Sequence, residues 1–365
     1  MRKLLFFLFL FANNNGNAQA LFKGLENLFT EPENYIAQYT ANAPLIDGNL
    51  TETSWERASW SGNFKDIEGA KQPLPALRTR MKMLWNDTCL FIAAELQEPN
   101  IWANLRNHDE IVFHDNDFEI FIDPDNDTHQ YYEIEVNALN TIFDLFMPKP
   151  YRNQSGAMIN WDLAKLRSGI SIKGTLNNPA DNDSSWTVEM AIPFQSLSMA
   201  NAIRSPREGE IWRINFSRVE WDTEIQEGKY VKKKDESGRN KPEHNWVWSP
   251  QGVINMHFPE RWGYLQFTRK ENNPAVVFEL PYTEKQRKYL WLCYYKQKEY
   301  ITRNRRYATS LTDLGIDTLG ITIDSHPNTL QMEATSRQFM ATITDDNMNL
   351  ISINDEGLIR ILRNR

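Results

Sequence analysis

The sequence predicts a mainly β protein, an antiparallel β-sandwich followed by a small α+β domain that contains one long helix and an antiparallel sheet. Three observations lead to this fold class. Short runs of alternating apolar and polar residues recur between residues 41 and 270, with Gly, Pro, Asn and Asp between them. Few stretches in that region have the 3.6-residue period of an amphipathic helix. After residue 271 the pattern changes to one helical segment followed by short strand-like runs.

Residues 1–20 are predicted to be a secretory signal peptide. Arg2 and Lys3 precede an apolar run that ends at Ala12, and small residues follow at Ala18 and Ala20. A transmembrane anchor is the alternative, but the run is about half of the roughly 20 residues needed to span a bilayer. We therefore expect export to the periplasm, the outer surface or the medium of a Gram-negative-type bacterium, with no transmembrane segment after cleavage.

Residues 21–40 have a mixed pattern and are interpreted as a linker or N-terminal arm, so that the sandwich occupies residues 41–270. Its predicted strands are RTRMKMLWN, LFIAAELQE, DFEIFIDP, YYEIEVNA, TIFDLFMP, SIKGTL, SWTVEMAIP, IWRINFSRVEW and WGYLQFT. Runs of strands with few helices between them are typical of an antiparallel sandwich. In residues 271–365, helical spacing predicts a helix over 284–304, and LGITI, LQMEATS, QFMATIT, NLISIN and GLIRIL predict the sheet.

The composition excludes some classes of partner. The formal net charge is −8, and all but one of the twelve tryptophans lie before residue 275. An acidic protein is a poor candidate for binding nucleic acid. Aromatic faces and carboxylates suit sugars or divalent cations better, since rings stack and carboxylates accept hydrogen bonds from hydroxyls. The two cysteines, Cys89 and Cys293, are expected to be buried thiols and not a disulfide.

The hairpin HDNDFEIFIDPDNDTHQYYEIEVN is unusually rich in acids. Strand side chains alternate with period two, so pairing of its two runs would place Asp117, Glu119, Glu133 and Glu135 on one sheet face. Like charges on neighbouring strands are destabilising unless something compensates them. One interpretation is a solvated acidic edge that deters aggregation. The other is a face that a cation or a polar ligand neutralises.

The turn of this hairpin, DPDNDTH, indicates a possible calcium site. Asp123, Asp125 and Asp127 match the first, third and fifth positions of an EF-hand loop, but Thr128 replaces the glycine and Ile134 the bidentate glutamate. The EF-hand is therefore rejected, and a different calcium site competes with a turn chosen for its local hydrogen bonds. The candidate metal ligands are Asp117, Asp123, Asp125 and Asp127.

The segment HNWVWSPQGVINMHFPERWGYLQF concentrates aromatic and polar residues. Trp246 and Trp248 are two positions apart and would share a strand face, while His257 precedes Trp262 and the last strand. Each tryptophan could belong to the core, where such rings dominate the packing, or line a binding surface.

No motif assigns a catalytic residue. The sequence has no Gly-x-Ser-x-Gly, no His-Glu-x-x-His, no glycine-rich phosphate loop and no Cys/His ligand array. A glycoside hydrolase needs only two acids roughly 5–10 Å apart, so Asp117, Glu119 and Glu135 keep that alternative open.

Several segments together resemble carbohydrate-binding module family 9. They are APLIDGNLTETSWERA, LWNDTCLFIAAELQEP, DNDFEIFIDPDND, YYEIEVNALNTIFD, WTVEMAIPFQSL, GEIWRINFSRVEW and WSPQGVINMHFPERWGYLQF, over about residues 41–268. The resemblance implies a β-sandwich, related in shape to DOMON-type sandwiches, that holds a sugar between aromatic side chains with the help of acidic and amide groups. It also implies structural calcium ions elsewhere in the domain.

The resemblance carries roles onto individual positions. Glu119 matches a ligand-contacting acid, Asn137 a polar position near the site, and Phe113 one of two sandwiching tryptophans. The other tryptophan is replaced by Met256 or His257, and Glu135 stands where the family has a basic contact, which implies an altered ligand or site. The candidate ligand-binding residues are Phe113, Glu119, Asn137, Arg218, Trp246, Trp248 and His257.

The run YYKQKEYITRNRRYATSLTDLGI is similar to the globular part of type IV pilin-like proteins, over about residues 283–361. The apolar leading helix that builds pilin filaments is absent, so the resemblance implies a surface or partner-docking role and not filament assembly.

We therefore expect an exported, non-catalytic protein that binds an oligo- or polysaccharide and takes part in polysaccharide recognition and catabolism. A glycoside hydrolase is the first alternative. A DOMON-like domain for interaction or for a cofactor is the second, with Met256 and His257 as the tempting haem ligands. Adjacent residues on a strand point to opposite faces, which argues against that pair.

Overall fold

The computed structural model describes residues 21–199, 203–270, 276–316 and 320–362, and the chain divides into two compact units. The larger unit spans Glu31–Pro281, and residues 21–30 join those from Tyr282 onward in the smaller unit. The signal peptide predicted for residues 1–20 lies outside the described residues. None of the helices in the described ranges is long and apolar enough to cross a membrane.

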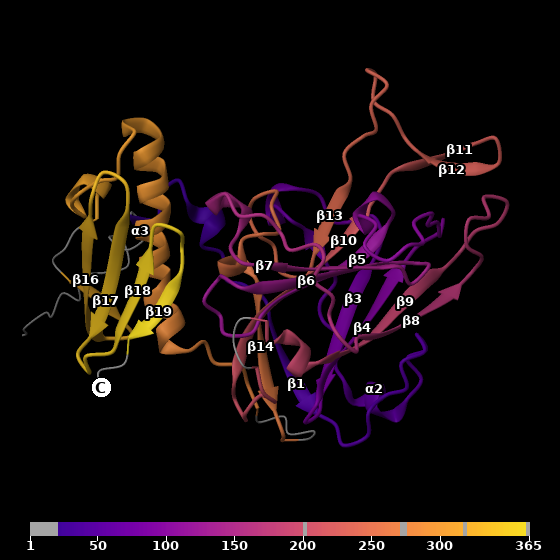
Figure 1. Cartoon of the computed structure of the whole chain (residues 1–365), viewed down its shortest axis with the longest axis horizontal. Helices are drawn as coiled ribbons and strands as arrows, with labels where there is room; N and C mark the ends of the chain where they lie inside the picture. The colour runs from indigo at the N-terminus through magenta and orange to yellow at the C-terminus, as the bar shows by residue number, and fades with distance from the viewer. Residues whose placement is uncertain (1–20, 200–202, 271–275, 317–319, 363–365) are drawn as a thin grey trace, which may run out of the picture. The chain divides into compact units, whose positions relative to one another are not determined.

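The larger unit is built on one continuous sheet that curls over on itself (Figure 1). The order of its main path is β7-β6-β5-β10-β14-β1-β3-β4-β9-β8, and β13 and β2 extend it from β10. The strands are β1 (Asn34–Tyr39), β2 (Lys65–Asp66), β3 (Thr79–Trp85), β4 (Cys89–Gln97), β5 (Asp117–Asp123), β6 (Tyr131–Asn137), β7 (Ile142–Met147), β8 (Arg167–Lys173), β9 (Ser185–Pro193), β10 (Ile211–Glu220), β13 (His244–Val247) and β14 (Gly263–Thr268). All nine strands predicted between residues 41 and 270 are present.

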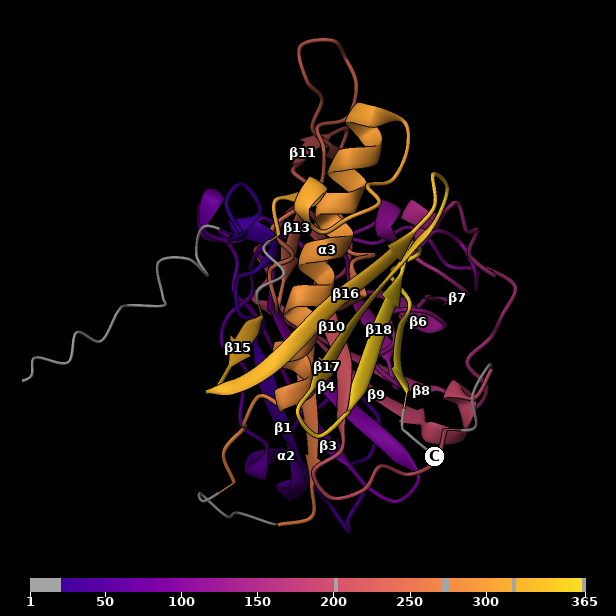
Figure 2. The same cartoon turned by 90° about the vertical axis from the view of Figure 1, so that its left-hand side faces the viewer.

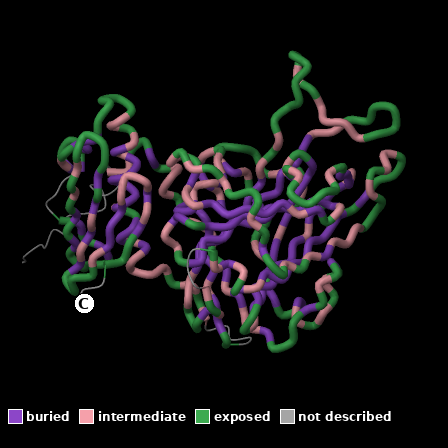
Figure 3. Tube along the Cα trace, in the orientation of Figure 1, coloured by how far each residue is buried: buried purple, intermediate pink, exposed green. Residues whose placement is uncertain are grey.

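The two halves of the curled sheet enclose one apolar core. Phe118, Ile120 and Ile122 of β5 belong to the same buried cluster as Ile92 of β4 and Met190 of β9. These strands therefore face each other across the core, the arrangement of a sandwich. Figure 3 shows the central strands of this unit buried along their length, while its turns are exposed.

The N-terminal strand corrects two expectations. Residues 34–39, interpreted as part of a linker, form β1, which pairs in parallel with both β14 and β3. The sheet is therefore mixed and not wholly antiparallel. Tyr35 and Ala37 of β1 are buried in the core, and the Trp85 Nε1 donates a hydrogen bond to the Ala37 carbonyl at 3.1 Å. This strand joins the two halves of the sandwich.

Short helices and one hairpin complete the larger unit. The helices are α2 (Thr53–Arg57), η2 (Gly69–Lys71), η3 (Val112–His114), η4 (Tyr151–Asn153), η5 (Phe194–Leu197) and η6 (Pro259–Arg261). The separate hairpin of β11 (Thr223–Gln226) and β12 (Lys229–Lys232) follows β10 and projects from the sandwich (Figure 1).

The smaller unit packs a helix on a five-stranded antiparallel sheet, as the sequence predicted. Its elements are η1 (Glu26–Leu28), α3 (Tyr282–Asn304), η7 (Thr312–Leu314), β15 (Ile321–Ile323), β16 (His326–Ala334), β17 (Phe339–Asp345), β18 (Leu350–Asn354) and β19 (Ile359–Leu362). The sheet order follows the sequence order, and β16 and β17 run obliquely across the helix in Figure 2. Tyr294 of α3 contacts Phe339 of β17, with ring centroids 6.3 Å apart.

Residues 21–30 belong to this smaller unit and are not a free arm. Phe22 contacts Tyr289, and Phe29 contacts Tyr295, with ring centroids 5.9 Å apart in both pairs. These aromatic contacts hold the segment on α3.

The two cysteines, Cys89 and Cys293, are both free and buried, as predicted.

Candidate functional site

A cleft of about 440 Å³ opens on the face of β5 and β6 that is turned away from the main core. The two strands pair in a register that sets Glu119 opposite Glu135 and Phe121 opposite Glu133. The side chains between them enter the core, because neighbours on a strand alternate. The prediction that the acids of the two runs share a sheet face is confirmed.

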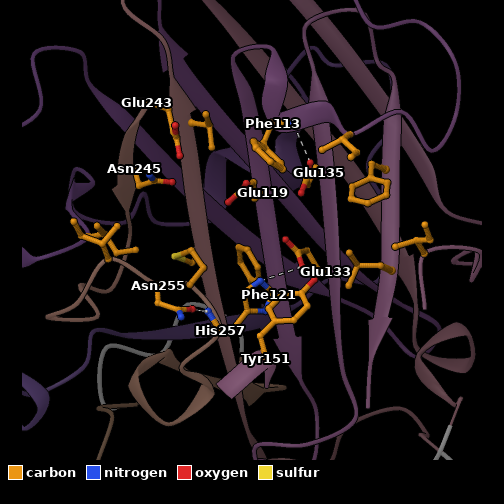
Figure 4. A pocket seen from close by; sticks show the side chains of 18 residues that line it. Phe113, Glu119, Phe121, Glu133, Glu135, Tyr151, Glu243, Asn245, Asn255 and His257 are labelled. Atoms are coloured by element: carbon orange, nitrogen blue, oxygen red, sulfur yellow. Dashed lines mark hydrogen bonds and ion pairs between the residues drawn. The ribbon is translucent and has the colours of Figure 1, made fainter. Parts of the chain in front are cut away.

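Other segments of the larger unit form the walls of the cleft. Phe113 comes from η3, Tyr151 from η4, Asn245 from β13, and Met256 and His257 from the loop before η6. In Figure 4 the carboxylates on the cleft floor lie between Phe113 at one end and Tyr151 with His257 at the other. The remaining lining residues are Ile67, Ile111, Phe121, Phe143, Leu145, Ile159, Val219, Glu243, Ile254 and Asn255.

The acids of this face are buried. Asp117 is 0% exposed, Glu135 2%, and Glu119 and Glu133 5% each. Both of their strands lie inside the sheet, between β7 and β10. The interpretation of this face as a solvated acidic edge is therefore wrong, because neither strand is an edge and little water reaches the carboxylates.

Three of the carboxylates converge. Asp117, Glu119 and Glu135 each offer an oxygen that lies within 4.8 Å of an oxygen of the other two. Asp117 Oδ1 accepts a hydrogen bond from the Val219 N–H at 3.3 Å, and Glu135 Oε2 accepts one from the Phe113 N–H at 3.0 Å. Backbone donors thus fix the position of two members of this trio.

Two oxygens of the acidic face have no hydrogen-bond partner. They are Oδ2 of Asp117 and Oε2 of Glu133. The cation nearest to the latter is the His257 ring when protonated, whose Nε2 lies 3.8 Å away. In the described part of the chain, no lysine or arginine forms an ion pair with either acid or with Glu119 and Glu135, and none lines the cleft.

Burial and mutual repulsion raise the pKa values of these acids. Burial raises the pKa of Glu119 to about 7. Burial, and then the charge of Glu119, raise the pKa of Asp117 well above its ordinary value. Burial raises the pKa of Glu133 and of Glu135 in the same way, with further contributions from the neighbouring acids. A cation in the cleft would reverse these shifts, since an opposite charge favours the ionised form.

His257 does not act as that cation at neutral pH. Its Nδ1 lies 2.8 Å from the Tyr131 hydroxyl, and burial lowers its pKa to about 4. Tyr151 packs edge-on against the imidazole, with ring centroids 4.4 Å apart at 74°. The ring is therefore a neutral, fixed part of the wall.

Two aromatic rings border the carboxylates and remain accessible. Phe113 is half-buried against Trp102, Val219 and Trp221. Tyr151 is 44% exposed, although it packs against His257. Such rings offer flat apolar faces of the kind on which a pyranose ring can stack.

The structure brings three of the seven predicted ligand-binding residues to the cleft, namely Phe113, Glu119 and His257. Asn137 lies on the same sheet face but is fully buried. Its Nδ2 donates to the Leu105 carbonyl at 2.9 Å, and its Oδ1 accepts from the Thr141 N–H at 3.1 Å. Asn137 therefore holds the turn after β6 and does not line the cleft.

Arg218 also lies elsewhere, on the core face of β10. It stands opposite Phe118, whose side chain enters the core. One guanidinium nitrogen donates to Glu98 Oε2 and to Glu220 Oε2, both at 2.7 Å, and another donates to the Gln97 carbonyl at 2.8 Å. Arg218 thus ties β10 to the end of β4 inside the sandwich, and it is not placed to bond a ligand in the cleft.

Trp246 and Trp248 are core residues. Both belong to the main buried cluster, at 6% and 3% exposure. Trp248 packs so closely on Gly263 that a Cβ there would lie 2.3 Å from its ring. Asn245 precedes Trp246 on β13, so its side chain points to the opposite face of the strand and lines the cleft.

The predicted calcium ligands separate into two places. Asp123, Asp125 and Asp127 converge at the β5–β6 turn, with carboxylate oxygens within 4.8 Å of one another. Asp117, at the opposite end of β5, belongs to the cleft trio and cannot join them.

The turn set suits a hard cation, because all of its converging atoms are carboxylate oxygens. Asp123 is fully buried, and burial, followed by the charges of Asp125 and Asp127, raises its pKa well above the ordinary value. Its two oxygens accept bonds from the N–H groups of Asn126 and Thr128, at 2.9 and 2.8 Å. The residues present therefore fit a calcium ion, which would remove the repulsion among the three carboxylates.

Met256 and His257 correct one argument from the sequence. They lie in an irregular loop, so both line the cleft and the alternation expected of a strand does not apply. His257 Nδ1 is occupied by Tyr131.

Sequence reasoning missed several lining residues, and their positions explain why. Tyr151 sits on a single 3-10 turn after β7, where no period predicts a direction. Asn245 and Asn255 lie in the segment of polar and aromatic residues, whose composition does not predict which side chains line a cleft, and Glu243 precedes a four-residue strand. Glu133 was the exception, since alternation along β6 placed it correctly.

Comparison with known families and structures gives one family. The sequence model of the carbohydrate family 9 binding domain-like family matches residues 46–252, which include β5, β6 and most of the cleft. The search of curated proteins gave no match.

Three solved structures are similar over the larger part of this chain. One is a protein of Bacteroides uniformis ATCC 8492 to which carbohydrate binding has been ascribed, with 15% identity, a TM-score of 0.48, and coverage of 65% of this chain and 100% of that one. The others are a family 9 carbohydrate-binding module of Caldicellulosiruptor kristjanssonii with cellotriose (18% identity, TM-score 0.40, coverage 68% and 100%) and with glucose (15%, 0.39, 66% and 100%).

Proposed function

The chain belongs to the carbohydrate family 9 binding domain-like family, and from this premise we propose that its cleft binds an oligosaccharide without cleaving it. The observation that supports the proposal is the pairing of accessible rings with hydrogen-bonding groups. Phe113 and Tyr151 border a floor of carboxylates, and Asn245 and Asn255 add amides to the wall. Rings can stack on sugar faces while carboxylates and amides bond hydroxyls.

The cleft is more acidic than the site that the family resemblance implies. Glu135 stands where a basic contact was expected, and Glu133 and Glu243 add further carboxylates. We infer that the ligand is a neutral or cationic glycan, since an acidic sugar would be repelled by this floor. The ring of Tyr151 takes the place of the second aromatic platform.

The first experiment is calorimetric titration of residues 21–365 with soluble oligosaccharides, neutral, acidic and amino-substituted, in the presence of calcium. Wild-type protein should bind at least one neutral or amino-substituted series. Phe113→Ala should weaken that binding about tenfold, as loss of a stacking face worth about 1–2 kcal/mol does. Trp60→Ala, which removes a half-buried ring outside the cleft, serves as the matched control. Absence of binding to every series would overturn the proposal.

A glycoside hydrolase is the alternative that the same carboxylates raise. Hydrolysis needs one protonated and one ionised acid on either side of the bond that breaks. Glu119 and Glu135 meet directly across β5 and β6, and both border the cleft. Incubation of the bound oligosaccharide with protein, followed by a reducing-sugar assay, separates the two functions. Release of reducing ends that Glu119→Gln abolishes would replace the binding proposal by hydrolysis.

We also propose that Asp123, Asp125 and Asp127 hold a structural calcium ion at the β5–β6 turn. The ion would offset the mutual repulsion of the three converging carboxylates and would fix the turn next to the cleft strands. Calcium should raise the melting temperature of the wild-type protein, and Asp125→Asn should reduce that rise.

Export and a part in polysaccharide catabolism are further proposals, which rest on residues 1–20 and on the family. Fractionation of cells that produce the whole chain would test export, since the predicted product begins near residue 21. For the smaller unit we propose docking of a protein partner, on the strength of its pilin-like sequence. Deletion of residues 282–365 should then leave sugar binding intact while it abolishes recruitment.

A further inference from the structure

The trio at the floor of the cleft has no cationic partner among the residues that the structure describes. Asp117, Glu119 and Glu135 place oxygens within 4.8 Å of one another and are at most 5% exposed. Carboxylates this close and this dry repel each other strongly, since little water screens them. Among the described residues, no lysine or arginine pairs with them.

A second observation points to a ligand at the same place. Oε2 of Glu133, a residue outside the trio, has no hydrogen-bond partner although the side chain is 5% exposed and lines the cleft. Oδ2 of Asp117 is also without a partner. Buried oxygens in native proteins almost always have a hydrogen-bond partner, so one unpaired oxygen in the trio and another on a neighbouring acid indicate a missing positive partner.

The depth of Asp117 decides what kind of cation fits. Glu119 and Glu135 border the cleft, but Asp117 is fully buried and does not line it. An ammonium group attached to a sugar ring would reach the first two carboxylates and not the third. A bare ion can reach all three, and hard divalent cations prefer all-oxygen ligand sets.

We propose that Asp117, Glu119 and Glu135 bind a divalent cation of the calcium class at the floor of the cleft. This site is distinct from the β5–β6 turn, because Asp117 and Asp123 occupy opposite ends of β5. The three carboxylates leave part of the coordination shell of a six- to eight-coordinate ion open toward the cleft. There, sugar hydroxyls can complete the shell, a consequence that rests on the proposed function.

Equilibrium dialysis against calcium chloride at pH 7.5, with the bound metal measured by atomic emission, tests the site. Asp117→Asn and Glu135→Gln should each bind one calcium ion fewer than wild type. Asp125→Asn should keep that ion, and so should Glu243→Gln, which removes a cleft carboxylate outside the trio. If either trio variant binds as much calcium as wild type, or if wild type loses all bound calcium through Asp125→Asn, the site does not exist.

Misfolding would not imitate this result. Each trio variant removes one of three acids that disfavour each other's ionisation and keeps the shape of the side chain, so its melting temperature in chelator should equal or exceed that of wild type. A trio variant that melts far below wild type in chelator would show that its carboxylate is already neutralised by a positive charge of the protein, and would count against the site.

Titration with the bound oligosaccharide in calcium and in chelator separates this proposal from the proposed function. Chelator should weaken sugar binding at least tenfold, both in wild type and in Asp125→Asn. Sugar binding that is equal in both buffers would overturn the bridging ion and leave the binding function standing. Calcium binding that depends on the trio, without binding of any sugar, would overturn the function and leave the cation site standing.

Discussion

Two clusters of buried charge lie on opposite faces of β5 and β10. On the core face, Arg218 donates hydrogen bonds to Glu98 and Glu220. On the cleft face, Glu119 and Glu135 oppose each other with no arginine or lysine paired to them in the described chain. The first cluster joins the two halves of the sandwich, and the second lines an opening to solvent.

The difference separates a structural cluster from a binding one. Removing a charge from water costs several kcal/mol, and the protein meets this cost at Arg218 with a guanidinium whose donors are all directed at acceptors. At the cleft the cost is left unmet, and Asp117 Oδ2 and Glu133 Oε2 have no partner. Perturbed acids in a cleft, with no internal partner, are typical of functional sites.

The largest expected effect tests the structural cluster. Arg218→Met should lower the free energy of unfolding by about 3–5 kcal/mol, because it leaves Glu98 and Glu220 buried without their cation. Urea denaturation at pH 7.5 measures the change. Lys65→Met, which breaks an exposed ion pair with Glu33, is the control and should cost less than about 1 kcal/mol. If both substitutions lower the free energy of unfolding by the same amount, the core cluster does not join the two halves of the sandwich.

The second effect is a pH dependence of the same cluster. Burial, and then the charge of Glu220, raise the pKa of Glu98 to about 8 in the folded protein, from an ordinary value of 4.5. A raised carboxyl pKa contributes stability that is complete below pH 4.5 and is lost as the pH rises through 8. Between pH 6 and 8 wild type should therefore lose about 2–3 kcal/mol more than Glu98→Gln, at about 1.4 kcal/mol per pH unit.

Urea denaturation of the two proteins at several pH values measures this difference. All other titrating groups are the same in both proteins, so their contributions to the pH dependence cancel. Parallel pH profiles would mean that Arg218 keeps Glu98 ionised throughout.

Sequence alone could predict which side chains lie on each face of β5 and β6, but not which groups from other segments contact them. Alternation along β5 and β6 placed Glu119, Glu133 and Glu135 together correctly. The same period runs through β10, where Arg218 alternates in step with Phe216 and so could have been assigned to the core. The prediction that Arg218 bonds the ligand did not use this period.

Other errors had no signal in the sequence. Asn137 has the direction that alternation predicts, but the segment around Leu105 and Asp115 covers it, and no local pattern reveals a covering loop. β1 lies in parallel between β14 and β3, strands that are far apart in sequence. Tyr151 projects from a single turn, whose direction only the folded chain determines.

The third effect tests the binding cluster through its accessible rings. Tyr151→Ala should weaken binding of the oligosaccharide by about 1–2 kcal/mol, because it removes an exposed apolar face beside the carboxylates. Calorimetric titration in calcium measures the change, and Tyr151→Phe should keep most of the affinity if stacking and not the hydroxyl provides it. Unchanged affinity in Tyr151→Ala would mean that the sugar stacks on Phe113 and not on Tyr151.

The smallest effect contrasts the two clusters most directly. Removing a charge from the cleft cluster should stabilise the protein, whereas removing Arg218 from the core cluster should destabilise it. Glu119→Gln replaces one of two acids that face each other across β5 and β6, and directly opposed like charges, which form when both acids ionise, destabilise a sheet by up to about 1 kcal/mol. In chelator at pH 8, above the pKa of about 7 to which burial raises Glu119, the variant should be more stable than wild type by a similar amount.

Calcium should make wild type the more stable of the two, since the cleft ion stabilises only the protein that keeps its three ligands. Thermal melts of both proteins in chelator and in calcium measure the four values. Glu220→Gln on the core face supplies the matched comparison, because it removes an acid that accepts two hydrogen bonds from Arg218 and should therefore gain less than Glu119→Gln in chelator. A gain from Glu220→Gln equal to that from Glu119→Gln would mean that the two clusters are equally incomplete, and the distinction between structural and binding charge on these strands would fail.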